Sequence, residues 1–249
     1  MEIPLGSLGA ALVLALVYAL GAWLDERGGA SGVWTRRRWV SVAAGVSVAY
    51  VFVDVLPELG AQHRTFLEAA GGERLLFAEQ RIYALALLAF IVLYGLEHMV
   101  LTSRERRRGT AEVGAGDAVY WLHLGGFAAY SGLIGYLLVE RAERGPVALA
   151  VYGLAMALHF LIVDHSLREE HGRVYDRAGR WVLAASVLAG WLVGATAPLS
   201  EVVFARLFAV LAGGVVITSL KAELPREREG RFWPFCLGAA AYAVLLFLT

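Results

Sequence analysis

Histidines and carboxylates recur inside stretches of the sequence that are otherwise almost wholly apolar. His159 lies 13 residues into the apolar run that begins at Pro146, and His123 lies near the start of the run that begins at Ala118. Imidazole and carboxylate groups bind divalent transition metals, whereas the single cysteine, Cys236, excludes thiolate clusters and internal disulfides. These residue types therefore point to metal chemistry that uses nitrogen and oxygen ligands.

The candidate residues fall into two groups. The candidate metal ligands are His159, Asp164, His123, His165, Glu97 and Asp54, and the polar residues that could line an ion path are Glu58, Ser131, Tyr130 and Glu223. Helical geometry places His123 about 7 Å and His159 about 10 Å from the same end of their helices, so the two imidazoles could meet. Asp164 lies about 140° around the helix from His159, which disfavours one mononuclear site for this pair.

Simpler readings of several candidates stay open. Asp164 and His165 are spaced to form ordinary i,i+4 pairs with Arg168 and Glu169. Glu97 and His98 are consecutive and point about 100° apart, so they cannot both line one groove. Asp54 and Glu58 share a helix face with Tyr50, beside Pro57. The alternative interpretation is that they are ordinary carboxylates at the outer membrane interface.

The composition identifies the elements that must position these side chains. Hydrophobic residues make up 59% of the 249 residues, charged residues make up 18%, and the mean hydropathy is +0.61, which excludes a soluble domain. Eight stretches have the roughly 20 residues needed to cross about 30 Å of hydrocarbon as helices. We therefore expect an all-α integral membrane protein with a single transmembrane domain over residues 1–249. The predicted spans are Leu5–Leu24, Val40–Leu59, Ile82–Thr102, Ala118–Val139, Pro146–Ser166, Gly179–Ala197, Val203–Ala222 and Phe232–Leu248.

Charge distribution predicts the orientation of these helices. Sixteen of the 22 Lys and Arg residues lie in the loops after helices 1, 3, 5 and 7. By the positive-inside rule these loops face the cytoplasm, so both termini lie outside a plasma (inner) membrane. An aromatic belt is expected at the inner interface, formed by Trp23, Trp39, Trp121, Trp181 and Trp233. The first apolar run is long enough to span and lacks a basic leader, so we expect it to be retained.

Two apolar segments carry the same short signature. Ala44-Gly45 precedes Leu56-Pro57 in the first half, and Ala212-Gly213 precedes Leu224-Pro225 at an offset of 168 residues. Weak repeats with a proline in each half are typical of transporters whose substrate path lies between the repeats. Chance is the alternative, because these residue types are common in membrane helices.

The chain resembles the ZIP family of divalent-metal transporters over its whole length. The resemblance rests on eight helices, outside termini and three motifs, which are Gly45 with Asp54-Val55-Leu56-Pro57-Glu58, Gly95-Leu96-Glu97, and Ala212-Gly213-Gly214 with Glu223-Leu224-Pro225. It implies a bundle in which helices 1–3 and 6–8 are inverted repeats around helices 4 and 5. It also implies a two-metal site built by histidine and acid motifs on helices 4 and 5.

Both of those site motifs depart from the family pattern. The run from His159 to Asp164 keeps the first histidine and the last acid, but Phe160 and Val163 replace middle ligands. In helix 4, Ser131 stands in the acid position, and Phe127 and Ala128 stand where histidine and asparagine are expected. The resemblance therefore implies a degenerate, rearranged metal site.

We expect a membrane transporter for a divalent cation such as Zn²⁺, with no obligatory cofactor and no enzymatic activity. Its expected partners are the lipid bilayer, the metal ion and, through the small-residue face of Gly190 and Gly194, a second copy forming a homodimer or another helix of the bundle. The sequence gives no support to nucleic-acid binding or to a nucleotide-driven pump. Two alternatives stay open, which are a transport-inactive scaffold or subunit and an intramembrane metal-dependent hydrolase.

Overall fold

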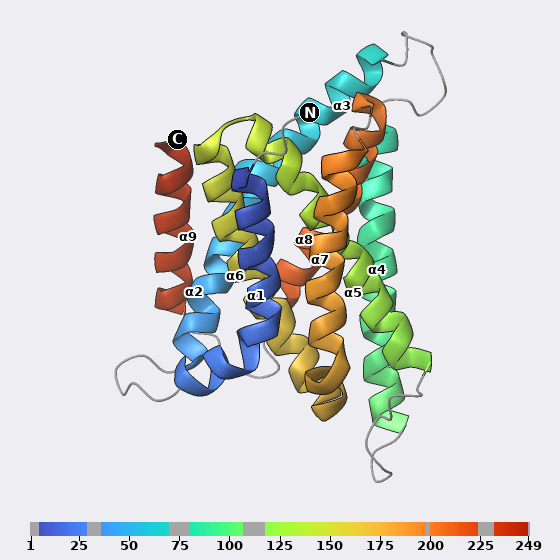
Figure 1. The fold of residues 1–249 in the computed structure, drawn as a ribbon, viewed down its shortest axis with the longest axis vertical. Helices are drawn as coiled ribbons and strands as arrows, with labels where there is room; N and C mark the ends of the chain where they lie inside the picture. Colours follow the sequence, from blue (N-terminus) through green and yellow to red (C-terminus); the bar gives the residue numbers. More distant parts are fainter. Residues whose placement is uncertain are drawn as a thin grey trace.

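The computed structural model describes residues 5–28, 36–69, 80–106, 118–197, 200–223 and 232–248, and it forms no strand within them. The helices pack side by side in one bundle (Figure 1). Two π-helical segments, η1 and η3, interrupt the α-helices. The elements are α1 (Leu5–Gly28), α2 (Arg36–Tyr50), η1 (Val51–Val55), α3 (Leu56–Ala69), α4 (Arg81–Arg106), α5 (Ala118–Glu143), α6 (Pro146–His171), η3 (Tyr175–Gly179), α7 (Arg180–Thr196), α8 (Glu201–Glu223) and α9 (Phe232–Phe247).

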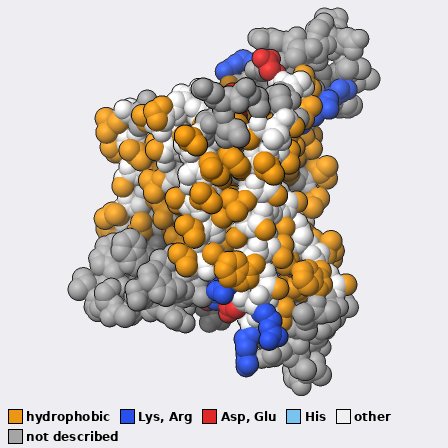
Figure 2. Space-filling model, in the orientation of Figure 1, with side chains coloured by type: hydrophobic (Ala, Val, Ile, Leu, Met, Phe, Trp, Pro, Cys, Tyr) orange, Lys and Arg blue, Asp and Glu red, His pale blue; other side chains and the backbone are white. Residues whose placement is uncertain are grey.

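Six helical stretches of the described chain are long and apolar enough to cross a membrane. They are Ser41–Arg64, Arg81–Ser103, Ala118–Glu143, Pro146–His171, Tyr175–Thr196 and Glu201–Ser219. These stretches confirm six of the eight predicted spans. The first and last predicted spans correspond to shorter apolar helices, Leu5–Gly21 and Phe232–Phe247. Figure 2 shows hydrophobic side chains over the middle of the visible face and charged side chains at its two ends.

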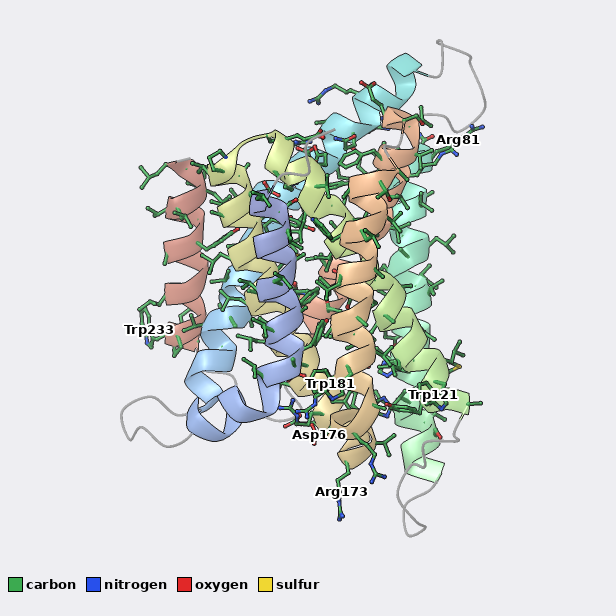
Figure 3. The ribbon with its side chains drawn as sticks, in the orientation of Figure 1. Arg81, Trp121, Arg173, Asp176, Trp181 and Trp233 are labelled. Carbon is green, nitrogen blue, oxygen red and sulfur yellow. The ribbon has the colours of Figure 1, made fainter. Side chains whose placement is uncertain are left out.

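The two ends of the bundle are distinguished by the direction of α5 and α6. We call the end where α5 begins and α6 ends the lower end, and the opposite end the upper end, as drawn in Figure 1. Trp121, Trp181 and Trp233 lie at the lower end, together with Arg173, whereas Arg81 lies at the upper end (Figure 3). The three tryptophans are exposed, as the predicted aromatic belt requires. The side chains of Trp23 and Trp39 lie outside the described residues.

The helix that contains Pro57 does not end near Leu59 as expected but continues to Ala69. Proline lacks an N–H group, and its ring clashes with the carbonyl of residue i−4, which here is Val53. The wider π-helical turn of Val51–Val55 lies immediately before this proline and accommodates the mismatch. Asp54 therefore lies within an irregular turn and not on a regular helix face.

Glycines of the predicted repeat allow two pairs of helices to approach closely. A Cβ atom at Gly45 in α2 would overlap the backbone carbonyl oxygen of Phe235 in α9, and one at Gly213 in α8 would overlap that of Ala86 in α4. Gly45 and Gly213 are the residues related by the offset of 168. The two positions thus make the same kind of backbone contact in two different helix pairs. Leu224 and Pro225 lie outside the described residues.

The small-residue face of α7 packs against α5 within the chain. A Cβ atom at Gly190 would overlap the backbone of Gly132 in α5, and one at Gly194 would come within 2.7 Å of the Tyr136 carbonyl oxygen. From the other side, Gly135 lies against the backbone of Val187. Small residues on both helices therefore join α5 to α7.

Replacing Gly190 by alanine should destabilise the bundle, because the added methyl group meets backbone atoms that cannot rotate away. We expect the free energy of unfolding in detergent to fall by roughly 1–3 kcal/mol, as for other overpacked cores. Gly153→Ala is the control, since a Cβ atom there meets nothing within 4 Å. Equal stability of the two variants in a thermal melt would contradict this packing.

Candidate metal-binding site

Polar side chains form a ladder between α5 and α6 from one end of the bundle to the other. In an α-helix, residues 7, 11 and 18 positions apart lie within about 20° of one face. His123, Tyr130 and Arg141 follow this spacing on α5. They pair with His171, His159 and Tyr152 of α6 respectively. We call these three pairs the polar ladder.

The lowest pair of the ladder belongs to a buried cluster of two imidazoles and two carboxylates. His123 Nδ1 lies 2.9 Å from His171 Nε2 and 3.9 Å from Glu170 Oε2. His123 Nε2 lies 3.5 Å from Glu97 Oε1 of α4. The four residues are between 0% and 7% exposed. Three helices thus bring nitrogen and oxygen donors together in a site shielded from solvent, which we call the lower cluster.

The donor atoms of the lower cluster fit the requirements of a divalent transition metal. One ligand atom from each of His123, Glu170 and His171 lies within 4.8 Å of the others. Tetrahedral zinc binds nitrogen and oxygen at about 2.0–2.2 Å, which separates neighbouring ligand atoms by about 3.3 Å. The distance from His123 Nδ1 to His171 Nε2, 2.9 Å, is shorter than this value, and the distance to Glu170 Oε2, 3.9 Å, is longer. The two imidazoles and the Glu170 carboxylate are ligands suited to Zn²⁺, Co²⁺, Mn²⁺ or Fe²⁺. Glu97 faces the other ring nitrogen of His123, Nε2, where it can orient that ring.

The end of α6 determines where Glu170 and His171 point. Gly172 follows His171 with φ of 55°, a left-handed conformation that glycine adopts readily, and its N–H bonds to the Arg168 carbonyl oxygen. The ring of Tyr120 packs edge-on against His171 at 4.9 Å between centroids, and Ser166 Oγ donates to Glu170 Oε1 at 3.4 Å. The helix end and these neighbours hold both ligands toward α5.

The middle pair of the ladder joins three helices. His159 Nε2 lies 3.3 Å from the Tyr130 hydroxyl and 3.3 Å from the Thr218 hydroxyl of α8. His159 Nδ1 is buried and has no hydrogen-bond partner among the described residues. Ser131, the neighbour of Tyr130, lies 3.0 Å from the Tyr18 hydroxyl of α1. His159 and His123 therefore belong to separate hydrogen-bonded groups and do not share a partner.

Asp164 and His165 make the i,i+4 pairs that their spacing predicts. Arg168 Nη2 donates to Asp164 Oδ2 at 2.8 Å, and His165 Nε2 lies 3.3 Å from Glu169 Oε1. The Tyr175 hydroxyl also donates to Asp164 Oδ1, at 2.7 Å. Asp164 is thus bound to a cationic side chain and a phenol, and neither it nor His165 joins the lower cluster.

At the upper end, Asp54 and Glu58 face arginines. Arg141 Nη2 lies 3.5 Å from Asp54 Oδ2, and Arg144 donates to both Glu58 oxygens at 2.7 and 3.0 Å. Gln62 also donates to Glu58 at 2.8 Å. Hydrogen bonding to Glu58 raises the pKa of Arg144 above its ordinary value, so this guanidinium stays charged.

The structure thus brings together only some of the predicted site residues. Glu97 and His123 meet in the lower cluster, whereas His159, Asp164, His165 and Asp54 have other partners. The side chain of Glu223 lies outside the described residues. Sequence reasoning missed Glu170 and His171 as ligands. Glu170 lies 11 residues past His159, which is about 20° from the same helix face, and this spacing was the available signal.

No family model, curated protein or solved structure matches the chain. The chemistry of the site therefore rests on the residues and their geometry. Among the described residues, His123, Glu170 and His171 of the lower cluster are the histidine and acidic side chains whose donor atoms converge closely enough to hold a metal ion.

We expect the purified protein to bind one Co²⁺ per chain at the lower cluster, seen as visible d–d absorption. His171→Ala should weaken this binding by more than about 10- to 100-fold, the effect known for outer-shell partners alone. His165→Ala is the matched control, because His165 is a histidine of the same helix that pairs elsewhere. Equal affinity of the two variants would place the metal outside the lower cluster.

Proposed function

We propose that the chain is a ZIP-like carrier that moves a divalent metal cation, such as Zn²⁺, across the plasma (inner) membrane. The observation that carries this proposal is the buried lower cluster of His123, Glu97, Glu170 and His171. Charged and imidazole groups are costly inside a membrane bundle and commonly mark an ion pathway. The metal ion is the cargo here, and the chain needs no resident cofactor.

The length of the polar ladder supports transport over simple binding. From His123 to Arg141 the ladder covers 18 residues, or about 27 Å at 1.5 Å per residue. The hydrocarbon core of a bilayer is about 30 Å thick. Polar groups therefore recur along nearly the whole depth that an ion has to cross, with His159, Tyr130 and Thr218 at the middle.

The architecture we propose has eight spans, with helices 1–3 and 6–8 as inverted repeats around helices 4 and 5. The equivalent backbone contacts of Gly45 and Gly213 support this arrangement, because the α2–α9 contact becomes the α8–α4 contact when the two repeats are exchanged. The positive-inside rule then assigns the lower end to the cytoplasm and both termini to the outside.

A metal-dependent hydrolase is the alternative that the lower cluster also favours, because two histidines and a carboxylate are ligands of catalytic zinc. The two functions differ in how firmly the ion is held. A hydrolase retains its zinc through dialysis, whereas a carrier releases its cargo and exchanges it across the membrane. A transport-inactive scaffold would need neither property.

Zn²⁺ uptake into proteoliposomes tests the carrier directly, with a zinc-sensitive dye trapped inside. Glu170→Gln should lower the uptake rate at least about tenfold, because it removes one anionic ligand. Glu169→Gln, at the exposed neighbouring position, should leave the rate near that of the wild type. A wild-type protein that binds Zn²⁺ stoichiometrically but shows no uptake would exclude the carrier.

His159→Ala separates the middle of the path from the lower cluster. We expect this variant to lose Zn²⁺ uptake, because the ion then lacks a ligand between the two ends. Its Co²⁺ affinity at the lower cluster should stay within about twofold of the wild type, since distant sites act independently. Tyr136→Phe, at a tyrosine of α5 outside the ladder, serves as the control. Unchanged uptake by His159→Ala would remove the histidine from the path.

A further inference from the structure

The two ends of the polar ladder give their carboxylates different partners. At the lower end, Glu97 and Glu170 face the imidazole of His123. At the upper end, Asp54 and Glu58 face Arg141 and Arg144. An imidazole and a carboxylate can share a metal ion, whereas a guanidinium is a fixed cation that cannot be a ligand. The upper carboxylates are therefore already occupied by cationic groups of the chain itself.

The arginines connect two separate parts of the bundle. Arg141 and Arg144 lie at the tip of the α5–α6 hairpin, and their acidic partners lie on η1 and α3. Glu140 holds both arginines from the hairpin side, through ion pairs with Arg141 and Arg144. The contacts to Asp54 and Glu58 thus link η1 and α3 to the hairpin, and the Glu140 pairs lie within the hairpin itself.

Arg141 also fills the top of the polar ladder. Its side chain is 7% exposed, and its guanidinium carbon lies 5.5 Å from the centre of the Tyr152 ring and 5.9 Å from that of Phe208 in α8. Aromatic rings on two sides favour a cation at this place. A positive charge thus occupies the upper end of the polar ladder, where it would repel an entering cation.

The acidic residues of this contact lie where the helix is irregular and can bend. Asp54 lies in the π-helical turn Val51–Val55, and Glu58 follows Pro57, which cannot donate a backbone hydrogen bond. Kinks and π turns are the places where a long helix changes direction. A change of helix direction at η1 would move the carboxylates of Asp54 and Glu58 away from the hairpin tip.

We propose that Arg141 and Arg144 form a cation lock on the upper end of the path, and that an entering divalent cation opens it by competing for Asp54 and Glu58. The direction of entry rests on the proposed function, but the lock itself does not. A divalent ion carries twice the charge of a guanidinium, so it binds the same carboxylates more strongly at equal distance. Arg144 and Glu58 are partly exposed, which lets such an ion reach them from the upper end.

A buried thiol below the lock reports whether the upper end is open. In a Cys236→Ser background, Ser47→Cys introduces a thiol at a serine that is 1% exposed and lies seven residues before Asp54. We expect a membrane-impermeant maleimide to label this thiol about tenfold faster in Arg141→Gln/Arg144→Gln than with the arginines intact, as the open population rises. Excess Mn²⁺, which binds oxygen ligands and leaves thiols free, should speed labelling only with the arginines intact.

Two controls define the labelling result. Glu201→Cys, exposed at the start of α8, should react equally in every background. The exchanged pair Asp54→Arg/Arg141→Asp should restore slow labelling, which a merely loosened fold would not do. Equal labelling of the thiol at position 47 with and without the arginines would overturn the lock. An absence of any Mn²⁺ effect would overturn the competition with the entering ion.

A reversible cross-link tests the lock without removing Arg141. Glu58→Cys/Arg144→Cys in the Cys236→Ser background can be joined by a bifunctional thiosulfonate and released by a reductant. We expect Zn²⁺ uptake to fall at least about tenfold on cross-linking and to recover on reduction, with Co²⁺ binding at the lower cluster unchanged. Full uptake by the cross-linked protein would overturn the lock. A wild type with no uptake would instead reject the carrier and leave the labelling result to decide the lock.

Discussion

The constraint on which the rest of the structure depends is that every ionisable group buried in an apolar bundle needs a partner from within the bundle. The hairpin of α5 and α6 supplies those partners along its whole length, through His123, Tyr130 and Arg141 on one helix and His171, His159 and Tyr152 on the other. The choice of partner changes with depth. Imidazoles face carboxylates at one end and guanidinium groups face them at the other, so a single pair of helices carries two sites of opposite character.

Close backbone contact makes this arrangement possible. Van der Waals packing has to hold membrane helices together, because lipid is as apolar as the side chains, and small residues bring the backbones near enough. Gly132, Gly135 and Gly190 join α5 to α7, which leaves the opposite side of α5 for its polar contacts with α6. Gly45 and Gly213 play the same part for α2 with α9 and for α8 with α4. The glycines of this sequence thus act as structural residues that support the polar ladder from outside it.

Much of the fold could be predicted from the sequence because its signals are local. Apolar runs predicted the helices, and i,i+4 spacing predicted the Asp164–Arg168 and His165–Glu169 pairs. The angle of about 100° between Glu97 and His98 predicted that they cannot both line one groove, and only Glu97 is buried. The partners of Asp54 and His123 could not be predicted, since they lie 87 and 48 residues away and depend on how whole helices pack. The extension of the helix beyond Pro57 was missed for another reason. A π-helical turn before Pro57 lets the helix continue past the proline, and composition alone does not reveal such a turn.

The link between α5 and α6 consists of only Arg144 and Gly145, with Gly145 at φ of 119° and Pro146 starting the next helix. So short a link leaves the two helices little freedom to slide or swing independently. A displacement at the hairpin tip therefore also displaces the lower end of the hairpin, where Tyr120 lies. Thermodynamic reciprocity then applies over the full height of the molecule. If a ligand at one end changes the affinity of the other end for its own ligand by some factor, the second ligand changes the affinity of the first end by the same factor.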